Sequence, residues 1–351
     1  MDILRTRPLG RSRIVLPGLG FGGSVIGNLH RPVTEVDAIA AVDAAWRAGI
    51  RYFDTAPLYG AGLGERRLAQ ALRFRPRDAF ILSTKVGRLL RPLPPNAPPD
   101  PDRLPFEIVH DYGYDGVMRS VEDSLQRLGV NRIDVLLIHD IDRYNHGPEG
   151  EEQRFREAMA GGYQALVRLR EQGVTKAIGV GVNNWQILVR CADAGDFDCF
   201  LLAGRYSLLE QGALASFLPL CEARGIGVIV GAPFNSGILA RGARPGGTYN
   251  YLEPPPEVLA RVAAMERAAA RHSVSLAAAA LQFPLGHPAV TAVLPGPRSA
   301  AQVDRAVAAF SEDIPSAFWL ELKEERLIDR AAPTPPGSDK SCRRKRAWNT
   351  S

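Results

Sequence analysis

The chain has 351 residues, 46% of them hydrophobic, and a net charge of +5 at neutral pH. Residues 333–351 hold five basic side chains and one acidic one, so the remaining body is close to neutral and lacks the basic footprint of a nucleic-acid-binding fold. No apolar run approaches ~20 residues and the arginine-rich start is soon broken by Pro17, which excludes a membrane span and a signal peptide.

The cysteines show neither the paired spacing of a metal site nor the density of a disulfide framework. We therefore predict no metal and reduced thiols in a cytoplasmic protein. They are Cys191, Cys199, Cys221 and Cys342.

Composition also predicts the domain organisation. Residues 1–330 are expected to form one domain, because no linker divides them. Residues 331–351 are rich in Pro, Ser and Arg and are expected to form a disordered basic tail, with binding of nucleic acid or an acidic surface as the alternative. Nothing in the sequence predicts an oligomeric state.

Strand-like runs alternate with helical patterns along this domain, as in a βα barrel. The first strand is predicted near residues 16–20, and a helix follows from Thr34, a suitable N-cap, to Ala48, with Gly49 as its stop. Further strands are predicted at residues 50–54, 79–85, 133–139, 177–182, 198–202, 227–230 and 290–294. Further helices are predicted at residues 164–172, 186–194, 213–224, 256–272 and 300–310. Eight strands and about eight helices predict a (β/α)8 TIM barrel.

Three long connections follow predicted strand ends, at residues 87–116, 140–162 and 234–255. The first contains seven prolines between Arg91 and Pro105. Because proline restricts the backbone, this segment is predicted to form a rigid substrate wall, with disorder as the alternative.

Four polar side chains, Asp54, Tyr59, Lys85 and His139, lie at or just past the ends of predicted strands. In a parallel barrel these ends meet on one face. An ammonium lowers the pKa of a nearby phenol, a carboxylate holds the ammonium, and an imidazole can bond a substrate oxygen, so together they suit acid/base chemistry. Singly, each also has an ordinary explanation as a cap, a surface aromatic, a solvated charge or a satisfied histidine.

With these residues the chain resembles the aldo-keto reductase superfamily. The resemblance runs from about residue 8 to 320 and includes Phe53-Asp54-Thr55-Ala56, Tyr59-Gly60, Gly64-Glu65, Ser83-Thr84-Lys85 and Leu137-Ile138-His139. It implies a barrel closed below by an N-terminal hairpin. It also implies a catalytic tetrad of Tyr59, Lys85, Asp54 and His139 and a nicotinamide dinucleotide cofactor.

A phosphate site is suggested by Pro295, Gly296, Arg298 and Ser299, which precede a predicted helix whose free amides would attract an anion. In the resembling family this position holds the adenosine phosphate. NADPH-preferring members place Lys at the position of Gly296 and Arg at that of Gln302, so their absence favours NAD. Arg298 and Arg305 keep NADP open as the alternative.

The resemblance also implies nicotinamide contacts from Asn183 and Asn184, where a Ser-Asn pair is usual. It departs from the family at Ala203, where a Gln is usual, and at Gly231, where a stacking aromatic is usual.

Within the superfamily, Gly179-Val-Gly-Val-Asn183 and Ala232-Pro-Phe-Asn-Ser-Gly237 resemble the branch of bacterial L-fucose and D-threo-aldose 1-dehydrogenases. This implies oxidation of an aldose at C1 to an aldonolactone, with Asp140, Asp142 and His146 as sugar contacts or as loop and capping residues. One alternative is a pyridoxal 4-dehydrogenase or other aldehyde oxidoreductase, in which Phe106 and Tyr112 would wall a flat ring. A second alternative is a cofactor-binding regulatory barrel.

Overall fold

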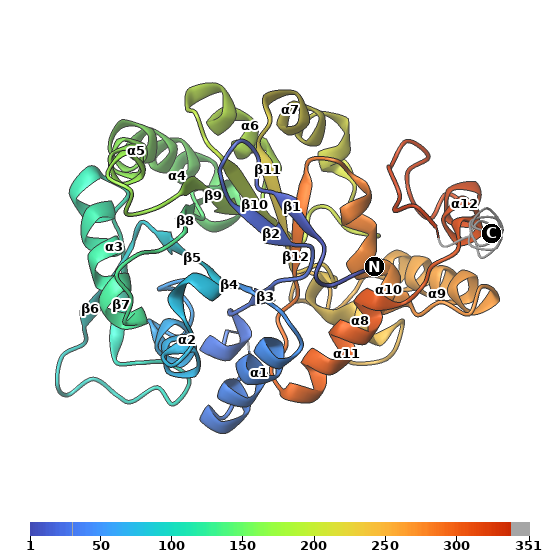
Figure 1. Cartoon of the computed structure of the whole chain (residues 1–351), viewed down its shortest axis with the longest axis horizontal. Coiled ribbons are helices and arrows are strands. Elements are labelled where there is room, and N and C mark those ends of the chain that lie inside the picture. Colours follow the sequence, from blue (N-terminus) through green and yellow to red (C-terminus); the bar gives the residue numbers. More distant parts are fainter. Residues whose placement is uncertain (30, 338–351) are drawn as a thin grey trace, which may run out of the picture.

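The computed structural model describes residues 1–29 and 31–337 (Figure 1). Eight parallel strands form one sheet in the order β12-β11-β10-β9-β8-β5-β4-β3. Their bounds are β3 Phe21–Gly22, β4 Tyr52–Asp54, β5 Ile81–Val86, β8 Val135–His139, β9 Ala177–Val182, β10 Cys199–Ala203, β11 Gly227–Gly231 and β12 Val290–Leu294. The sheet closes between its first and last strands, where the Gly20 amide donates to the Val293 carbonyl and the Gly22 amide to the Pro295 carbonyl, both at 2.9 Å. The predicted TIM barrel is confirmed.

Helices surround this barrel, as Figure 1 shows. Their bounds are α1 Glu35–Arg47, α2 Leu63–Leu72, α3 Tyr114–Leu128, α4 Arg143–Glu157, α5 Tyr163–Glu171, α6 Trp185–Ala194, α7 Phe217–Arg224, α8 Ile238–Arg241, α9 Pro256–Arg271, α10 Leu276–Gln282, α11 Ala300–Ser311 and α12 Ser316–Glu324. The Thr34 hydroxyl accepts from the Asp37 amide, so Thr34 caps α1 as predicted.

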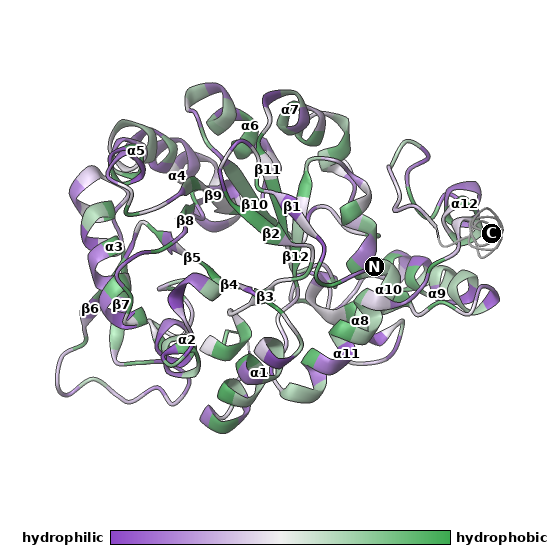
Figure 2. Cartoon of the chain, viewed as in Figure 1, coloured by the Kyte–Doolittle hydropathy of each residue, from purple (hydrophilic) through white to green (hydrophobic). Residues whose placement is uncertain are grey.

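Alternating side chains along each strand divide the core into two parts. On β8, Leu136 and Ile138 pack outward against the helices, whereas Val135 and Leu137 fill the barrel interior. The central strands are the most uniformly hydrophobic part of the chain, as expected for strands buried on both faces (Figure 2).

An N-terminal hairpin of β1 (Thr6–Pro8) and β2 (Val15–Pro17) lies across one end of the barrel (Figure 1). Its Leu9, Ile14 and Leu16 side chains join the interior core. The strand predicted at residues 16–20 is therefore displaced. Pro17 ends a hairpin strand because it has no amide to extend a ladder, and the barrel strand β3 begins only at Phe21.

The long connections contain regular structure that was not predicted. Residues 87–116 form an antiparallel hairpin of β6 (Arg88–Pro92) and β7 (Phe106–His110), and then begin α3. The proline-rich stretch is the hairpin tip, and the Leu104 amide bonds the Gly60 carbonyl at 3.0 Å. Residues 140–162 are mostly α4, and residues 234–255 contain α8.

The packed body continues past the predicted boundary at residue 330. Ala332 is fully buried, and Gly286 lies so close to Thr334 that a Cβ on it would come within 2.7 Å of the Thr334 Cα. Residues 338–351, which include Cys342 and the basic run of the predicted tail, lie outside the described residues. No helix of the described chain is long and apolar enough to cross a membrane.

Candidate active site

Asp54, Lys85 and His139 lie on β4, β5 and β8, and Tyr59 lies on the loop after β4. The Lys85 ammonium donates to Asp54 Oδ2 at 2.8 Å, to the Thr55 carbonyl at 2.9 Å and to the Tyr59 hydroxyl at 3.1 Å. All four side chains are at least nine-tenths buried. The structure therefore brings together the tetrad that the sequence predicted.

Two glycines allow Tyr59 to reach this position. A Cβ on Gly27 would lie 2.5 Å from the Tyr59 Cβ, and one on Gly64 would lie 3.1 Å from it. The loop around Tyr59 also needs left-handed residues, because Gly60 and Gly62 have φ values of 63° and 95°. The glycines of this segment thus have a packing role next to the phenol.

Burial raises the pKa of Tyr59 to about 12, although Lys85 opposes the rise. Lys85 lowers the pKa as predicted, but its effect is smaller than that of burial, because desolvation of the phenolate exceeds the attraction of the ammonium. Burial lowers the pKa of Lys85, but Asp54 and Tyr59 together raise it above its ordinary value. At neutral pH the pair is a phenol beside an ammonium.

A second layer of hydroxyls fixes Asp54. The Ser83 hydroxyl donates to Asp54 Oδ1 at 2.7 Å, and the Tyr52 hydroxyl lies 3.1 Å from Ser83 Oγ. Both carboxylate oxygens are thus used, one by Ser83 and one by Lys85. Asp54 positions the ammonium and has no free oxygen for a ligand.

The His139 imidazole stands perpendicular to the Tyr59 ring, with ring centroids 6.0 Å apart. Burial lowers the pKa of His139 well below its usual range, and Arg88 and Lys85 lower it further. The ring is therefore neutral at physiological pH, with one nitrogen protonated. Nε2 lies 3.3 Å from Asp140 Oδ2, whereas Nδ1 is buried without a partner among the described residues. A proton on Nε2 is the tautomer that Asp140 favours.

Arg88 is a site residue that the sequence did not suggest. Its guanidinium donates to Asp140 Oδ2 at 2.6 Å, and both side chains are about nine-tenths buried. It lies at the start of β6, within a connection that carried no recognisable strand pattern. The only sequence signal was an acidic residue directly after His139.

Asp142 and Tyr112 have structural roles. Asp142 caps α4, where Oδ1 accepts from Asn145, and its Oδ2 accepts from the Asn183 amide at 2.9 Å. Tyr112 is fully buried, with its hydroxyl 2.7 Å from the His139 carbonyl, so it cannot wall a ligand. The idea of a flat pocket formed by Phe106 and Tyr112 is therefore wrong.

The candidate phosphate site lies where β12 leads into α11. A Cβ on Gly296 would lie 2.9 Å from Val25 Cγ2, so the loops after β3 and β12 meet there. Pro295 makes the backbone bond to Gly22. Ser299 is the N-cap of α11, yet its side chain makes no capping bond, which leaves the hydroxyl available to an anion.

Gln302 is used within the protein, because its Oε1 accepts from the Arg298 amide at 3.0 Å. The pKa of Arg298 is lowered by burial and then by Arg31 and Arg241, so three arginines face the same region. Glycine loops, a free hydroxyl, a helix N-terminus and clustered positive charge fit the phosphates of a dinucleotide.

Asn183 and Asn184 follow β9, which pairs with β8. Asn184 caps α6 through Oδ1, which accepts from the Gln186 amide at 3.0 Å, so only its Nδ2 remains for a ligand. Asn183 Nδ2 makes a long contact of 3.5 Å to the Ala203 carbonyl. No three His, Cys, Asp or Glu side chains of the described chain are placed to hold a metal ion.

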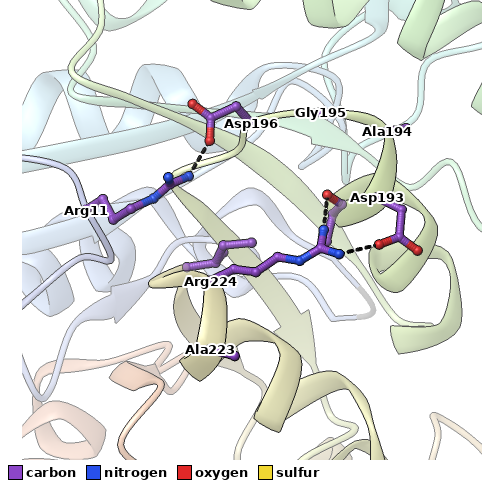
Figure 3. Close-up of a pocket in the computed structure, with 9 residues that line it drawn as sticks. Arg11, Asp193, Ala194, Gly195, Asp196, Ala223 and Arg224 are labelled. Carbon is purple, nitrogen blue, oxygen red and sulfur yellow. Dashed lines mark hydrogen bonds and ion pairs between the residues drawn. The ribbon is translucent and has the colours of Figure 1, made fainter.

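A surface hollow of about 560 Å³ lies away from these residues, between the ends of α6 and α7 and the β1–β2 hairpin (Figure 3). Its charges are already paired, Arg11 with Asp196 and Arg224 with Asp193. The chemistry is concentrated instead at the carboxyl ends of the strands.

The aldo/keto reductase family model matches residues 18–325. The chain belongs to the aldo/keto reductase family. It is 44% identical over 334 residues to a pyridoxal 4-dehydrogenase of Microbacterium luteolum, covering 92% of this chain and 97% of the relative. It is 39% identical over 330 residues to a D-threo-aldose 1-dehydrogenase of a Pseudomonas species, covering 92% and 96%.

Among solved structures, this aldo/keto reductase matches AKR11C1 from Bacillus halodurans in its holo form, with a TM-score of 0.72 and 24% identity over 95% of this chain and 98% of that one. That likeness supports the barrel alone. The family and its dehydrogenase relatives make the protein an NAD(P)-dependent oxidoreductase, as predicted.

Proposed function

We propose that this aldo/keto reductase oxidises a cyclic hemiacetal to a lactone, with an aldose as the substrate and C1 as the reacting carbon. The observation that carries the proposal is the buried chain Asp54–Lys85–Tyr59 beside a neutral His139. Both 1-dehydrogenation of an aldose and 4-dehydrogenation of pyridoxal fit this class, because each compound forms a cyclic hemiacetal. The two relatives named for these activities support it.

In the proposed reaction, Tyr59 takes the proton of the anomeric hydroxyl, and the Nε2 proton of His139, which in the free protein faces Asp140 at 3.3 Å, is donated to the same oxygen. Lys85 stabilises the phenolate that Tyr59 needs for this step, and Asp54 keeps Lys85 charged and in place. A nicotinamide dinucleotide, when bound, accepts the hydride of C1. Loss of that hydride and of the proton turns the hemiacetal carbon into the lactone carbonyl.

For the cofactor we propose contacts from Asn183, Asn184, Gly296, Arg298 and Ser299, with NAD preferred. Support for NAD comes from glycine at position 296 and from the internal bond of Gln302, neither of which offers a charge to a 2′-phosphate. The arginine cluster around Arg298 would attract the phosphates common to NAD and NADP. The three described cysteines are buried free thiols, in keeping with the proposed cytoplasmic location.

Pyridoxal is the second candidate substrate, favoured by the 44% identity to a pyridoxal 4-dehydrogenase and by one aromatic side chain at the carboxyl end of the strands. Tyr251 lies in the connection that follows the carboxyl end of β11, and its side chain is partly exposed. A flat heteroaromatic ring would stack on such a side chain.

Reduction of NAD and of NADP with L-fucose, D-arabinose, L-xylose and pyridoxal tests the proposal, with Tyr59→Phe as the control. Turnover of the sugars that is lost in Tyr59→Phe would support the aldose reaction, and turnover of pyridoxal alone would support the second candidate. Tight cofactor binding without turnover of any of the four would instead indicate a regulatory barrel.

A further inference from the structure

The residue after β8 has an unusual backbone. Asp140 has a φ of 52°, in the left-handed region that few residues other than glycine adopt. Its amide still bonds the Gly181 carbonyl at 2.9 Å, and the Tyr112 hydroxyl lies 2.7 Å and 3.2 Å from the carbonyls of His139 and Asp140. The surrounding contacts thus hold the turn in a conformation that costs free energy.

The β6–β7 hairpin supplies those contacts from both of its ends. The Asp111 amide bonds the Gly87 carbonyl at 3.0 Å, which closes the hairpin next to the barrel. A Cβ on Gly87 would lie 2.2 Å from the Tyr112 ring, so the ring packs directly on the glycine. Arg88 follows at one end and Tyr112 at the other, and both hold the 139–140 turn.

Only one of the two oxygens of the Asp140 carboxylate has a polar contact within the described chain. Arg88 and His139 both contact Oδ2, at 2.6 Å and 3.3 Å. Among residues 1–29 and 31–337 these two contacts on Oδ2 are the polar contacts of the carboxylate, and the side chain keeps 10% of its surface exposed. Burial raises the pKa of Asp140 to about 6, although Arg88 opposes the rise. The carboxylate is therefore desolvated, ionised at neutral pH and short of one hydrogen-bond donor.

We propose that Asp140 is a specificity-determining residue that accepts a hydrogen bond from the substrate hydroxyl on the carbon next to the reacting carbon. The inference rests on the proposed function, because it places the reacting oxygen against Tyr59 and His139. Asp140 Oδ2 lies 3.3 Å from His139 Nε2, so the carboxylate stands next to the imidazole, and Oδ1 is the oxygen left for a hydroxyl on the neighbouring carbon. Arg88 is the positioning residue that holds the carboxylate.

This contact selects among the candidate substrates. An aldose has a hydroxyl on C2, directly next to the reacting C1. Pyridoxal carries its ring hydroxyl one carbon further away. The geometry of Asp140 therefore favours an aldose, and more generally a hemiacetal with a hydroxyl on the adjacent carbon.

D-arabinose, D-ribose and 2-deoxy-D-ribose provide the test, because they differ only at C2. We expect the wild type to prefer one 2-hydroxy epimer over the deoxy sugar by ~10- to 100-fold in kcat/KM, the range of a hydrogen bond to a charged group. Asp140→Asn tolerates the left-handed backbone and removes the charge, and should reduce this ratio to within ~3-fold. Asp142→Asn, a matched change in a helix cap, should leave the ratio unchanged.

Four results would overturn the inference. If the wild type oxidises 2-deoxy-D-ribose with the same kcat/KM as D-arabinose and D-ribose, Asp140 makes no contact with the C2 hydroxyl. An Asp140→Asn enzyme that loses the same factor on all three sugars shows that Asp140 only orients His139. A wild type active on pyridoxal but on none of the three sugars refutes the C2 contact and leaves hemiacetal oxidation standing. If neither sugars nor pyridoxal are oxidised although NAD binds, the proposed function fails and the inference fails with it.

Discussion

The two ends of β8 each carry a buried aspartate, and the environments of the two carboxylates differ. Asp134, just before the strand, accepts from Arg77 and from the Leu82 amide on Oδ2, and its Oδ1 lies 3.3 Å from the Lys176 ammonium. Asp140, just after the strand, has a left-handed backbone and contacts on one oxygen only. Cationic side chains at both oxygens mark the first carboxylate as structural, and the left-handed backbone with contacts on one oxygen marks the second as functional.

The largest expected effect is at the tetrad beside Asp140. Tyr59→Phe removes the hydroxyl that exchanges the substrate proton, so kcat should fall by ~10²- to 10⁴-fold. Binding of NAD, measured by quenching of protein fluorescence, should change little because the ring remains. A variant that kept the kcat of the wild type would refute the acid/base role.

Asp134→Asn should act on stability and leave the chemistry intact. It leaves the partly buried Arg77 without its charged partner and weakens the bond to the Leu82 amide, for a loss of about 1–3 kcal/mol in the free energy of unfolding. Urea unfolding measures the loss, and kcat/KM of the folded enzyme should stay within ~2-fold of the wild type. A large loss of activity without loss of stability would remove the distinction between the two ends of β8.

The pH dependence should identify Asp140. Its pKa is raised to about 6, so kcat/KM for a hydroxylated substrate should rise with pH through this value as the carboxylate ionises. Arg88, Lys85 and Asp142 are the charged groups that act on it. Burial lowers the pKa of His110 to about 4 and that of His139 well below its usual range, so these two rings do not titrate near pH 6. Burial also lowers the pKa of His146, and the Asp140→Asn variant separates the two groups. The rise in kcat/KM near pH 6 should be absent in Asp140→Asn. If the rise persists in this variant, another group is responsible for it.

The same profile should climb again in alkaline solution. Because burial raises the pKa of Tyr59 to about 12, oxidation, which needs the phenolate, should become faster as pH rises above neutrality. Reduction, which needs the phenol, should not. An oxidation rate that is flat from neutral to alkaline pH would mean that Tyr59 is not the group that takes the proton.

The smallest expected effect is at the arginine cluster. Arg298→Ala should weaken NAD binding by ~3- to 10-fold, because one of several charges near the phosphates is lost. Titration calorimetry with NAD and NADP measures it. A loss confined to NADP would place Arg298 at the 2′-phosphate and count against the preference for NAD.

The sequence was sufficient to predict the barrel and the position of the tetrad. Asp54, Lys85 and His139 end apolar runs that are buried on both faces, so topology alone brings them together. The pKa of Tyr59 was not predictable in the same way, because it depends on how far burial exceeds the effect of Lys85.

The partners of Asp140 were also beyond prediction. They depend on a hairpin whose strands lie in a proline-rich segment and on the contact between Gly87 and Tyr112, neither of which has a sequence period. Gln302 and Asn184 illustrate the same limit. Their positions match cofactor residues of the family, yet the side-chain oxygen of each already accepts a hydrogen bond from a backbone amide.

The most direct test of the account is transfer of deuterium from L-fucose labelled at C1, followed by NMR of the cofactor and the sugar product. We predict that the wild type places the deuterium on nicotinamide and forms the lactone, and that Tyr59→Phe does neither at a comparable rate. NAD that binds tightly and remains unlabelled with this sugar would contradict an aldose 1-dehydrogenase.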